Sequence, residues 1–305
     1  MTVSGTVAQA LRFRPQEQGF LGLGSDQAGQ HANARAVIIP FGLEATVSYG
    51  GGTAGGPQAI LDASPQLEYF DEEVWAEPYR QFGIATLEAP DIAEGNKAAL
   101  AQLGDLVEAV LEAGKFPMVL GGEHALTPGA IRPFVSRYPG LTILQFDAHA
   151  DLRDGYRGDP YSHASAMRRA LDFDGVRLVQ VGIRAISAEE IPFLEANPHR
   201  ITTFWGKDKA SWRAHEIAAA VGEGPVYLTF DVDGFDASLM PATGTPEPGG
   251  LFFNEACEII LGVAKRARIV GADVVELAPV PGLHACDFTA AKLVYKILTA
   301  ALYRG

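Results

Sequence analysis

Eight short apolar runs recur along the chain, and each is separated from the next by enough residues for a turn or a helix. The runs begin at residues 36, 82, 116, 141, 177, 201, 225 and 268 and are rich in β-branched and aromatic residues. Continuous apolar strands joined by helical crossovers are typical of a parallel sheet covered on both faces. The pattern therefore predicts an α/β fold, either a closed (β/α)₈ barrel or an open doubly wound sheet, and periodicity does not choose between them.

The stretches between these runs carry helical patterning. Apolar residues between Leu100 and Leu111 recur on one helical face, and Gly114 is a suitable stop for that helix. Asp287 is expected to cap the last helix. No linker or internal repeat divides the chain, so we expect one domain over residues 36–305, preceded by an N-terminal arm over residues 1–35.

The chain is acidic. With 24 Lys and Arg against 37 Asp and Glu, its formal net charge is −13, which argues against nucleic acid because phosphate binding needs a basic face. An acidic chain is compatible with a small cationic substrate. We find no apolar run long enough for a membrane span and no secretion signal, so we expect no membrane partner and a cytoplasmic location. Cys257 and Cys286 are expected to be free thiols.

The segment LTILQFDAHAD, from Leu141, is a strand that ends in three ionisable side chains at a spacing of two. Alternate residues of an extended chain point to the same side, so Asp147, His149 and Asp151 are expected to converge at the end of the sheet. Carboxylate and imidazole groups aimed at one point suggest a metal site.

Two other predicted strands end in side chains of the same type. GGEH, with His124, follows one run, and DVDGFD, with Asp231, Asp233 and Asp236, follows another. If neighbouring strands bring these groups together, the carboxylates repel one another and raise one another's pKa values unless cations bind. Taken singly, an Asp after a strand is commonly a helix cap and His124 could be a satisfied buried histidine. The joint pattern favours a site for two divalent ions.

The ligand types also restrict the metal and the chemistry. Carboxylate and imidazole ligands without thiolate fit Mn²⁺ and similar ions better than a structural zinc. A pair of ions about 4 Å apart can share a water and lower its pKa towards neutrality. The expected reaction class is metal-assisted hydrolysis.

The motifs GGEH, FDAHAD, FDVDGFD, PATGTPEPGG and DVVEL, in this order, resemble the ureohydrolase family of arginases and agmatinases from about Val37 to the C-terminus. The segment GLEATVSYGGGTAGGPQAIL most resembles bacterial agmatinases. The resemblance implies a three-layer α/β/α ureohydrolase domain around a mainly parallel eight-stranded sheet, which favours the open sheet. It also implies two Mn²⁺ per chain, hydrolysis of a guanidino group to urea and an amine, and a homo-oligomer, a trimer or a hexamer.

The resemblance also implies roles for single residues. One ion would be bound by His124, Asp147, Asp151 and Asp231, and the other by Asp147, His149, Asp231 and Asp233. Catalytic roles would fall to Asp151, His163 and Glu276. Glu276 would pair with the substrate guanidinium, Thr245 would line the substrate site, and His163 would shuttle protons, for which a near-neutral pKa would be suited.

Three positions depart from the family pattern, and the substrate stays open. Glu123, Ala125 and Ala237 replace the commoner Asp, Ser and Pro, so Ni²⁺, Co²⁺ or Zn²⁺ is not excluded. Agmatine is the first choice of substrate, with guanidinobutyrate, guanidinopropionate, arginine and free guanidine behind it. Sequence does not say which of four charged loop residues faces the pocket: Arg153, Asp154, Arg157 or Asp159. A metal-dependent amide deacetylase and a noncatalytic assembly protein are the alternatives from other classes.

Overall fold

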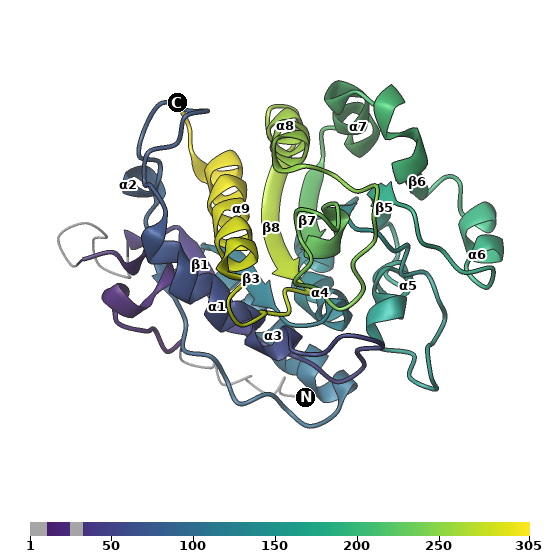
Figure 1. The fold of residues 1–305 in the computed structure, drawn as a ribbon, viewed down its shortest axis with the longest axis horizontal. Helices are drawn as coiled ribbons and strands as arrows, with labels where there is room; N and C mark the ends of the chain where they lie inside the picture. The colour runs from purple at the N-terminus through teal and green to yellow at the C-terminus, as the bar shows by residue number, and fades with distance from the viewer. Residues whose placement is uncertain (1–10, 25–32) are drawn as a thin grey trace, which may run out of the picture.

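The computed structural model, which describes residues 11–24 and 33–305, forms one open sheet between two layers of helices (Figure 1). The sheet has eight strands in the order β2-β1-β3-β8-β7-β4-β5-β6, and every neighbouring pair is parallel. Strands β2 and β6 lie at opposite ends of this order and do not pair with each other, so the sheet does not close. The predicted three-layer fold is confirmed, and the barrel is excluded.

Each strand overlaps one of the eight predicted apolar runs. The strands are β1 Ala36–Phe41, β2 Ile84–Thr86, β3 Phe116–Gly121, β4 Thr142–Phe146, β5 Arg177–Ile183, β6 Ile201–Trp205, β7 Pro225–Asp231 and β8 Arg268–Val275. Strand β2 is shorter than its run because Phe82 ends a helical turn and Gly83 adopts a φ of 61°, which favours glycine.

The helices divide between the two faces of the sheet. One face is covered by α1 Gly56–Ala63, α2 Tyr79–Phe82, α7 Ala214–Val221, α8 Phe253–Ala264 and α9 His284–Leu302. The other is covered by α3 Asn96–Glu112, α4 Thr127–Arg137, α5 Ala166–Ala170 and α6 Ile191–Ala196. The predicted helix through Leu100 is therefore present, and Gly114 follows it with a φ of 69°.

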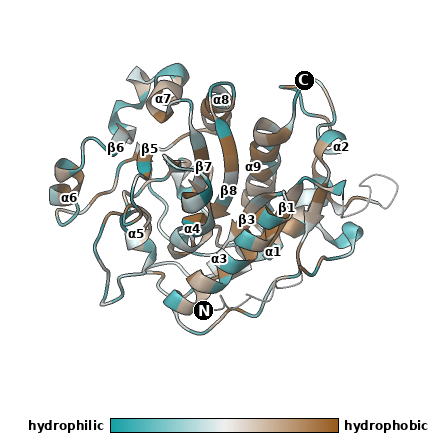
Figure 2. Cartoon of the chain, turned by 180° about the vertical axis from the view of Figure 1, so that it is seen from behind, coloured by the Kyte–Doolittle hydropathy of each residue, from teal (hydrophilic) through white to brown (hydrophobic). Residues whose placement is uncertain are grey.

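Two apolar cores result, one on each side of the sheet. Along β1, Ala36 and Ile38 pack into the core under α9, whereas Val37 and Ile39 pack into the core under α3. This alternation is the period of two that a strand imposes. Since both faces are covered, the strand needs apolar residues at every position, which explains the continuous runs. Figure 2 shows the apolar colouring of the central strands between more polar peripheral loops.

The described part of the N-terminal segment packs on the domain. Phe20, Leu21 and Leu23 are buried in the core under α9, and Phe13 forms an antiparallel bridge with Leu87. Residues 1–10 and 25–32 lie outside the described residues. The division of the chain into an arm and one domain stays a prediction.

The predicted cap of the last helix is wrong. Helix α9 begins at His284, directly after a turn in which Gly282 has a φ of 84°, and its N-cap is Leu283. Asp287 therefore lies inside the first turn, where a negative charge still favours the helix N-terminus. Among the helices of the described residues, none is both long and apolar enough to cross a membrane.

Candidate metal centre and active site

The sequence motifs follow four neighbouring strands and lie at one edge of the sheet. In chain order these strands are β3, β4, β7 and β8, but in space their order is β3-β8-β7-β4. His124 follows β3, Asp147 follows β4, Asp231 ends β7, and Glu276 follows β8. Because the strands are parallel, all four side chains emerge at the carboxyl edge, where open α/β sheets bind their ligands.

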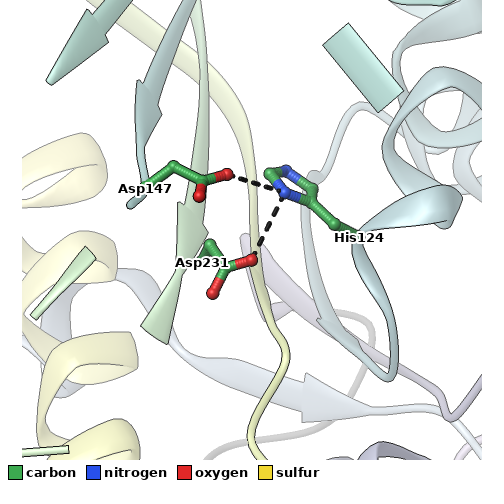
Figure 3. A group of neighbouring side chains, drawn as sticks. All are labelled: His124, Asp147 and Asp231. Carbon is green, nitrogen blue, oxygen red and sulfur yellow. Dashed lines mark ion pairs between the residues drawn. The ribbon is translucent and has the colours of Figure 1, made fainter. Parts of the chain in front are cut away.

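The ligand-type side chains converge into two groups that share Asp147. His124, Asp147 and Asp231 form one group, and Asp147, His149 and Asp233 form the other, with the candidate ligand atoms of each within 4.8 Å of one another. Figure 3 shows the first group, with His124 pointing between the two carboxylates. The Nδ1 atom of His124 lies 3.1 Å from Asp147 Oδ2 and 3.5 Å from Asp231 Oδ2. The fold thus brings together predicted ligands that lie up to about a hundred positions apart in the sequence.

Asp151 places a third carboxylate close to the His124 imidazole. Its Oδ2 atom lies 3.0 Å from His124 Nδ1. Asp151 and Glu276 both have positive φ, 54° and 66°, although neither is a glycine. Such backbone conformations are costly and cluster at functional sites. Holding both residues there indicates that the position of each carboxylate matters.

The imidazole of His124 is oriented so that Nδ1 is free to bind a cation. Its Nε2 atom lies 2.9 Å from Thr229 Oγ1, and Thr229 in turn donates to Asp273 Oδ1 at 2.5 Å. Since the Thr229 proton goes to Asp273, Thr229 accepts from His124 Nε2–H. In the neutral imidazole Nδ1 then carries the lone pair, and it is buried without a hydrogen-bond partner in the described residues. Burial lowers the pKa of His124, but the neighbouring carboxylates of Asp147, Asp151 and Asp231 raise it by more, to well above its ordinary value.

Backbone and amide donors hold the carboxylates in place. Asp147 accepts from the backbone of His149 at 2.6 Å and from the Gln145 side chain at 2.7 Å. Asp233 accepts from the backbone N–H of Ala148, and Asp231 accepts from the backbone N–H of Asp233, both at 2.9 Å. Asp231 is therefore also a cap of a short 3₁₀ helix, the plainer interpretation of such a residue, while its Oδ2 faces His124.

The titration behaviour of the cluster reflects crowded negative charge. Burial and the charge of Asp147 raise the pKa of Asp151 to about 7. Burial, with the neighbouring charge of Glu123, raises the pKa of Glu276 to about 8 although the His124 N–H bond lowers it. Burial lowers the pKa of His149, but Asp233 and Asp147 raise it by more, to about 12. Without cations, protons must neutralise this cluster.

The orientation of the His124 imidazole and the crowded negative charge of the cluster both fit a pair of divalent cations. The free Nδ1 of His124 and the carboxylate oxygens around it are a donor set for a first-row ion, and His149 Nδ1 lies 2.9 Å from Asp233 Oδ2 in the second group. Positive charge at these points would also replace the protons that the buried carboxylates otherwise retain.

A cavity of about 430 Å³ opens onto this cluster. His163, Thr245 and Glu276 line it together with His124, His149, Asp151, Asp231 and Asp233. Arg153 is the member of the charged loop that lines the cavity, and it also pairs with Glu189 at 2.9 Å. Asp236 lies outside the cluster and is half-buried, and its carboxylate organises a turn by accepting from the backbone N–H groups of Ser238, Gly249 and Gly250.

The structure changes the expectation for His163. Burial, followed by the positive charges of nearby imidazoles and Arg157, lowers its pKa to about 4, below the near-neutral value expected from the sequence. His163 is therefore neutral at physiological pH. Sequence analysis also missed Tyr156, whose ring meets that of His163 edge-on at 5.8 Å, and Thr46, which contacts the His163 imidazole. Thr46 belongs to no charged motif, and Tyr156 lies in the charged loop but carries no charge itself.

Comparisons with known proteins agree with this geometry. The profile described as the Arginase family matches residues 34–300. The N(1)-aminopropylagmatine ureohydrolase of Synechocystis sp. is 38% identical over 287 residues, 90% of this chain and 92% of that protein. The agmatinase of Bacillus subtilis is 32% identical over 278 residues, 88% of this chain and 92% of that protein. The crystal structure of the agmatine ureohydrolase of Thermoplasma volcanium has a TM-score of 0.81 at 30% identity, covering 91% of this chain and 93% of that chain.

Proposed function

Because this chain belongs to the arginase family, we propose that it hydrolyses the guanidino group of a small cationic substrate to urea and an amine. Agmatine, which would give putrescine and urea, is the first choice. The observation that carries the proposal is the pair of ligand groups sharing Asp147, with Glu276 lining the same cavity.

Each of the two divalent ions would be held by four side chains. His124, Asp147, Asp151 and Asp231 would bind one, and Asp147, His149, Asp231 and Asp233 the other. Bound there, the ions would supply Lewis acidity and make the attacking water a better nucleophile. Mn²⁺ is the first choice, and the departure at Glu123 keeps Ni²⁺, Co²⁺ and Zn²⁺ open.

Glu276 is suited to receive the guanidinium. With both ions bound, four ionised aspartates would match the charge of two divalent ions, and an ionised Glu276 would add one further negative charge to the cavity. A carboxylate meets the planar donors of a guanidinium with paired hydrogen bonds. The backbone N–H of His124 donates to Glu276 Oε1 at 2.6 Å and orients the group. Thr245, on the cavity wall, would contact the same substrate.

His163 is suited to proton transfer because it is neutral in the resting protein. A neutral imidazole first accepts a proton as water attacks, and then returns it to the leaving nitrogen, which departs as an amine. The low pKa of about 4 favours this return, since the protonated imidazole is a strong acid. The shuttle role of the sequence prediction is retained, with neutral His163 as its starting state.

N(1)-aminopropylagmatine is a second candidate substrate. It is favoured by the name of the Synechocystis relative, which is 38% identical to this chain. It carries an aminopropyl group that agmatine lacks, so it would fill more of the same cavity. The cytoplasmic location and the homo-oligomeric state, a trimer or a hexamer, remain predictions.

The test is urea release by the Mn²⁺-loaded protein. Agmatine, N(1)-aminopropylagmatine, guanidinobutyrate, guanidinopropionate, arginine and free guanidine are compared at equal concentration, each with a chelated control. We expect urea from agmatine or its aminopropyl derivative, lost on chelation. No urea from any compound with Mn²⁺ or Ni²⁺ would overturn the proposal and bring the amide deacetylase forward.

A further inference from the structure

Thr46 lies between a buried carboxylate and the His163 imidazole. Glu123 is fully buried, and its carboxylate accepts from the Thr46 backbone N–H at 2.7 Å and from the Thr46 hydroxyl at 3.0 Å. The same hydroxyl oxygen accepts from the backbone N–H of His163 at 3.1 Å and lies 3.1 Å from His163 Nδ1. Three segments that are distant in sequence thus meet at one hydroxyl group.

A count of donors and acceptors decides the tautomer of His163. A threonine hydroxyl has one proton and two lone pairs. Its proton goes to Glu123, and one lone pair receives the His163 backbone N–H. The remaining lone pair can only receive a proton, so the neutral imidazole carries its hydrogen on Nδ1 and its free lone pair on Nε2.

The loop that carries Thr46 is fixed independently of His163. The Glu44 carboxylate accepts from the backbone N–H groups of Gly52 and Ala54, at 3.0 and 2.7 Å. The backbone N–H of Glu123 donates to Leu43 at 2.7 Å, and the backbone passes Gly122 so closely that an added Cβ would lie 2.0 Å from the Leu43 carbonyl oxygen. Thr46 therefore sits on a preformed platform, which is what positioning a reactive side chain requires.

We propose that Glu123 and Thr46 are positioning residues that hold His163 in the Nδ1–H tautomer and leave Nε2 as the atom that accepts and returns the proton. This inference rests on the proposed function, because the shuttle role of His163 does. It also gives a task to Glu123, which departs from the commoner Asp of the resembling family. Neither residue touches the reacting atoms in this arrangement.

The first experiment reads the tautomer directly by ¹⁵N NMR of the histidine-labelled, Mn²⁺-free protein. His163→Asn identifies the His163 signals among those of the seven histidines. We expect Nδ1–H in the wild type and in Thr46→Ser, and a shift towards Nε2–H in Thr46→Val, which keeps the shape but removes the hydroxyl. Thr289→Val in α9, whose hydroxyl bonds the Ala285 carbonyl, is the matched control and should leave the tautomer unchanged. An unchanged tautomer in Thr46→Val would overturn the inference.

Glu123→Gln provides a second and opposite reading. The amide nitrogen of Gln would donate to the Thr46 hydroxyl, which would then turn its own proton to His163 Nδ1 and invert the tautomer to Nε2–H. This variant does not depend on Thr46→Val being well folded. Retention of Nδ1–H in a folded Glu123→Gln protein would count against the proposal that Glu123 and Thr46 set the tautomer of His163.

Kinetics then separate positioning from a structural role. At equal bound metal, Thr46→Val should lower kcat by about tenfold to a hundredfold, within the range of general acid–base effects, with little change in KM. Thr46→Ser should rescue most of that loss. A purely structural role would give equal losses in both variants and overturn the inference. If the wild type releases no urea, the proposed function fails, whereas the NMR result still decides the tautomer.

Discussion

Two clusters of buried charge in the described part of the chain are balanced in different ways. In one, Lys296 of α9, 5% exposed, lies 3.1 Å from Asp71 Oδ1 and 2.9 Å from Glu72 Oε1. Asp71 is fully buried, so a cation and an anion neutralise each other inside the protein. In the metal centre, four aspartates and Glu276 surround two imidazoles, and within the described part of the chain the aspartates form ion pairs with these imidazoles only. Arg153 lines the same cavity but pairs with Glu189. Only the first cluster is complete as it stands.

The pKa shifts show what this difference means. Burial lowers the pKa of Lys296, but the hydrogen bonds to Glu72 and Asp71 raise it by more, so the ammonium stays charged at neutral pH. In the metal centre, the pKa of Asp151 is raised to about 7 and that of Glu276 to about 8. A cluster that supplies its own counter-charge is structural, whereas one that lacks it is a site for an external cation. A buried charge cluster without its own counter-charge can therefore be recognised as a candidate ligand-binding site.

The largest expected effect comes from breaking the metal centre. Asp231→Asn removes one negative ligand while its amide oxygen still accepts the Asp233 backbone N–H. We expect urea release to fall to the level of the chelated wild type, because an ion would lose a ligand shared by both metal positions. At the same time the metal-free variant should be more stable than the metal-free wild type, since repulsion is relieved. Urea assays and thermal unfolding with chelator measure both.

The comparison of the two charge clusters holds only if Asp231→Asn both lowers urea release and raises the stability of the metal-free protein. Lys207→Met, which removes an exposed cation paired with Asp208, is the matched control and should change neither quantity. Activity retained in Asp231→Asn would remove this carboxylate from the centre. Lower stability of the metal-free variant would mean that Asp231 is a structural residue rather than an unbalanced ligand.

The strands, and the charged side chains that follow them, could be predicted from the sequence. The eight apolar runs located the strands because a sheet covered on both faces needs apolar residues at consecutive positions. The FDAHAD and DVDGFD motifs located carboxylate and imidazole groups that the fold brings together, because residues directly after a strand are placed by the strand itself. These are local relations, and local relations can be read from one sequence.

The non-local relations could not be read. The ion pair of Lys296 with Asp71 joins residues 225 positions apart in the sequence, and the sequence around either residue does not identify its partner. The placement of β8 between β3 and β7 is a property of the crossovers rather than of any one strand. Thr46 acquires its contacts to Glu123 and His163 only when the loop folds over the strand ends.

The next effect should be seen on stability alone. Lys296→Met removes the cation and leaves Asp71 buried without its counter-charge, which should cost about 3–5 kcal/mol of unfolding free energy. Urea release by the remaining folded protein should not change, because the pair lies outside the catalytic cavity. Denaturant unfolding measures the loss. Glu72→Gln is the control: its side chain is 62% exposed, so the loss should stay below about 1 kcal/mol. A loss in urea release with Lys296→Met would contradict the separation of the two clusters.

The smallest effect is a pH dependence that reverses with metal. The folded-state pKa values of Asp151 and Glu276, about 7 and about 8, lie above the ordinary values of 3.8 and 4.5 for these side chains. Between these limits the folded state binds more protons than the unfolded state, so the stability of the metal-free protein falls as pH rises from about 4 to about 8. The fall should reach at least about 1.4 kcal/mol, the equivalent of one pKa unit.

With saturating Mn²⁺ the sign should change. The ions take the place of the protons, and the ligands bind them better as they deprotonate, so stability should rise with pH over the same window. Denaturant unfolding from pH 5 to pH 8, with Mn²⁺ and with chelator, compares the two slopes directly. Lys207→Met, which removes an exposed cation paired with Asp208, should leave both slopes unchanged. Parallel slopes with and without metal would show that the carboxylates at the strand ends do not exchange protons for cations, and the distinction between the two clusters would fall.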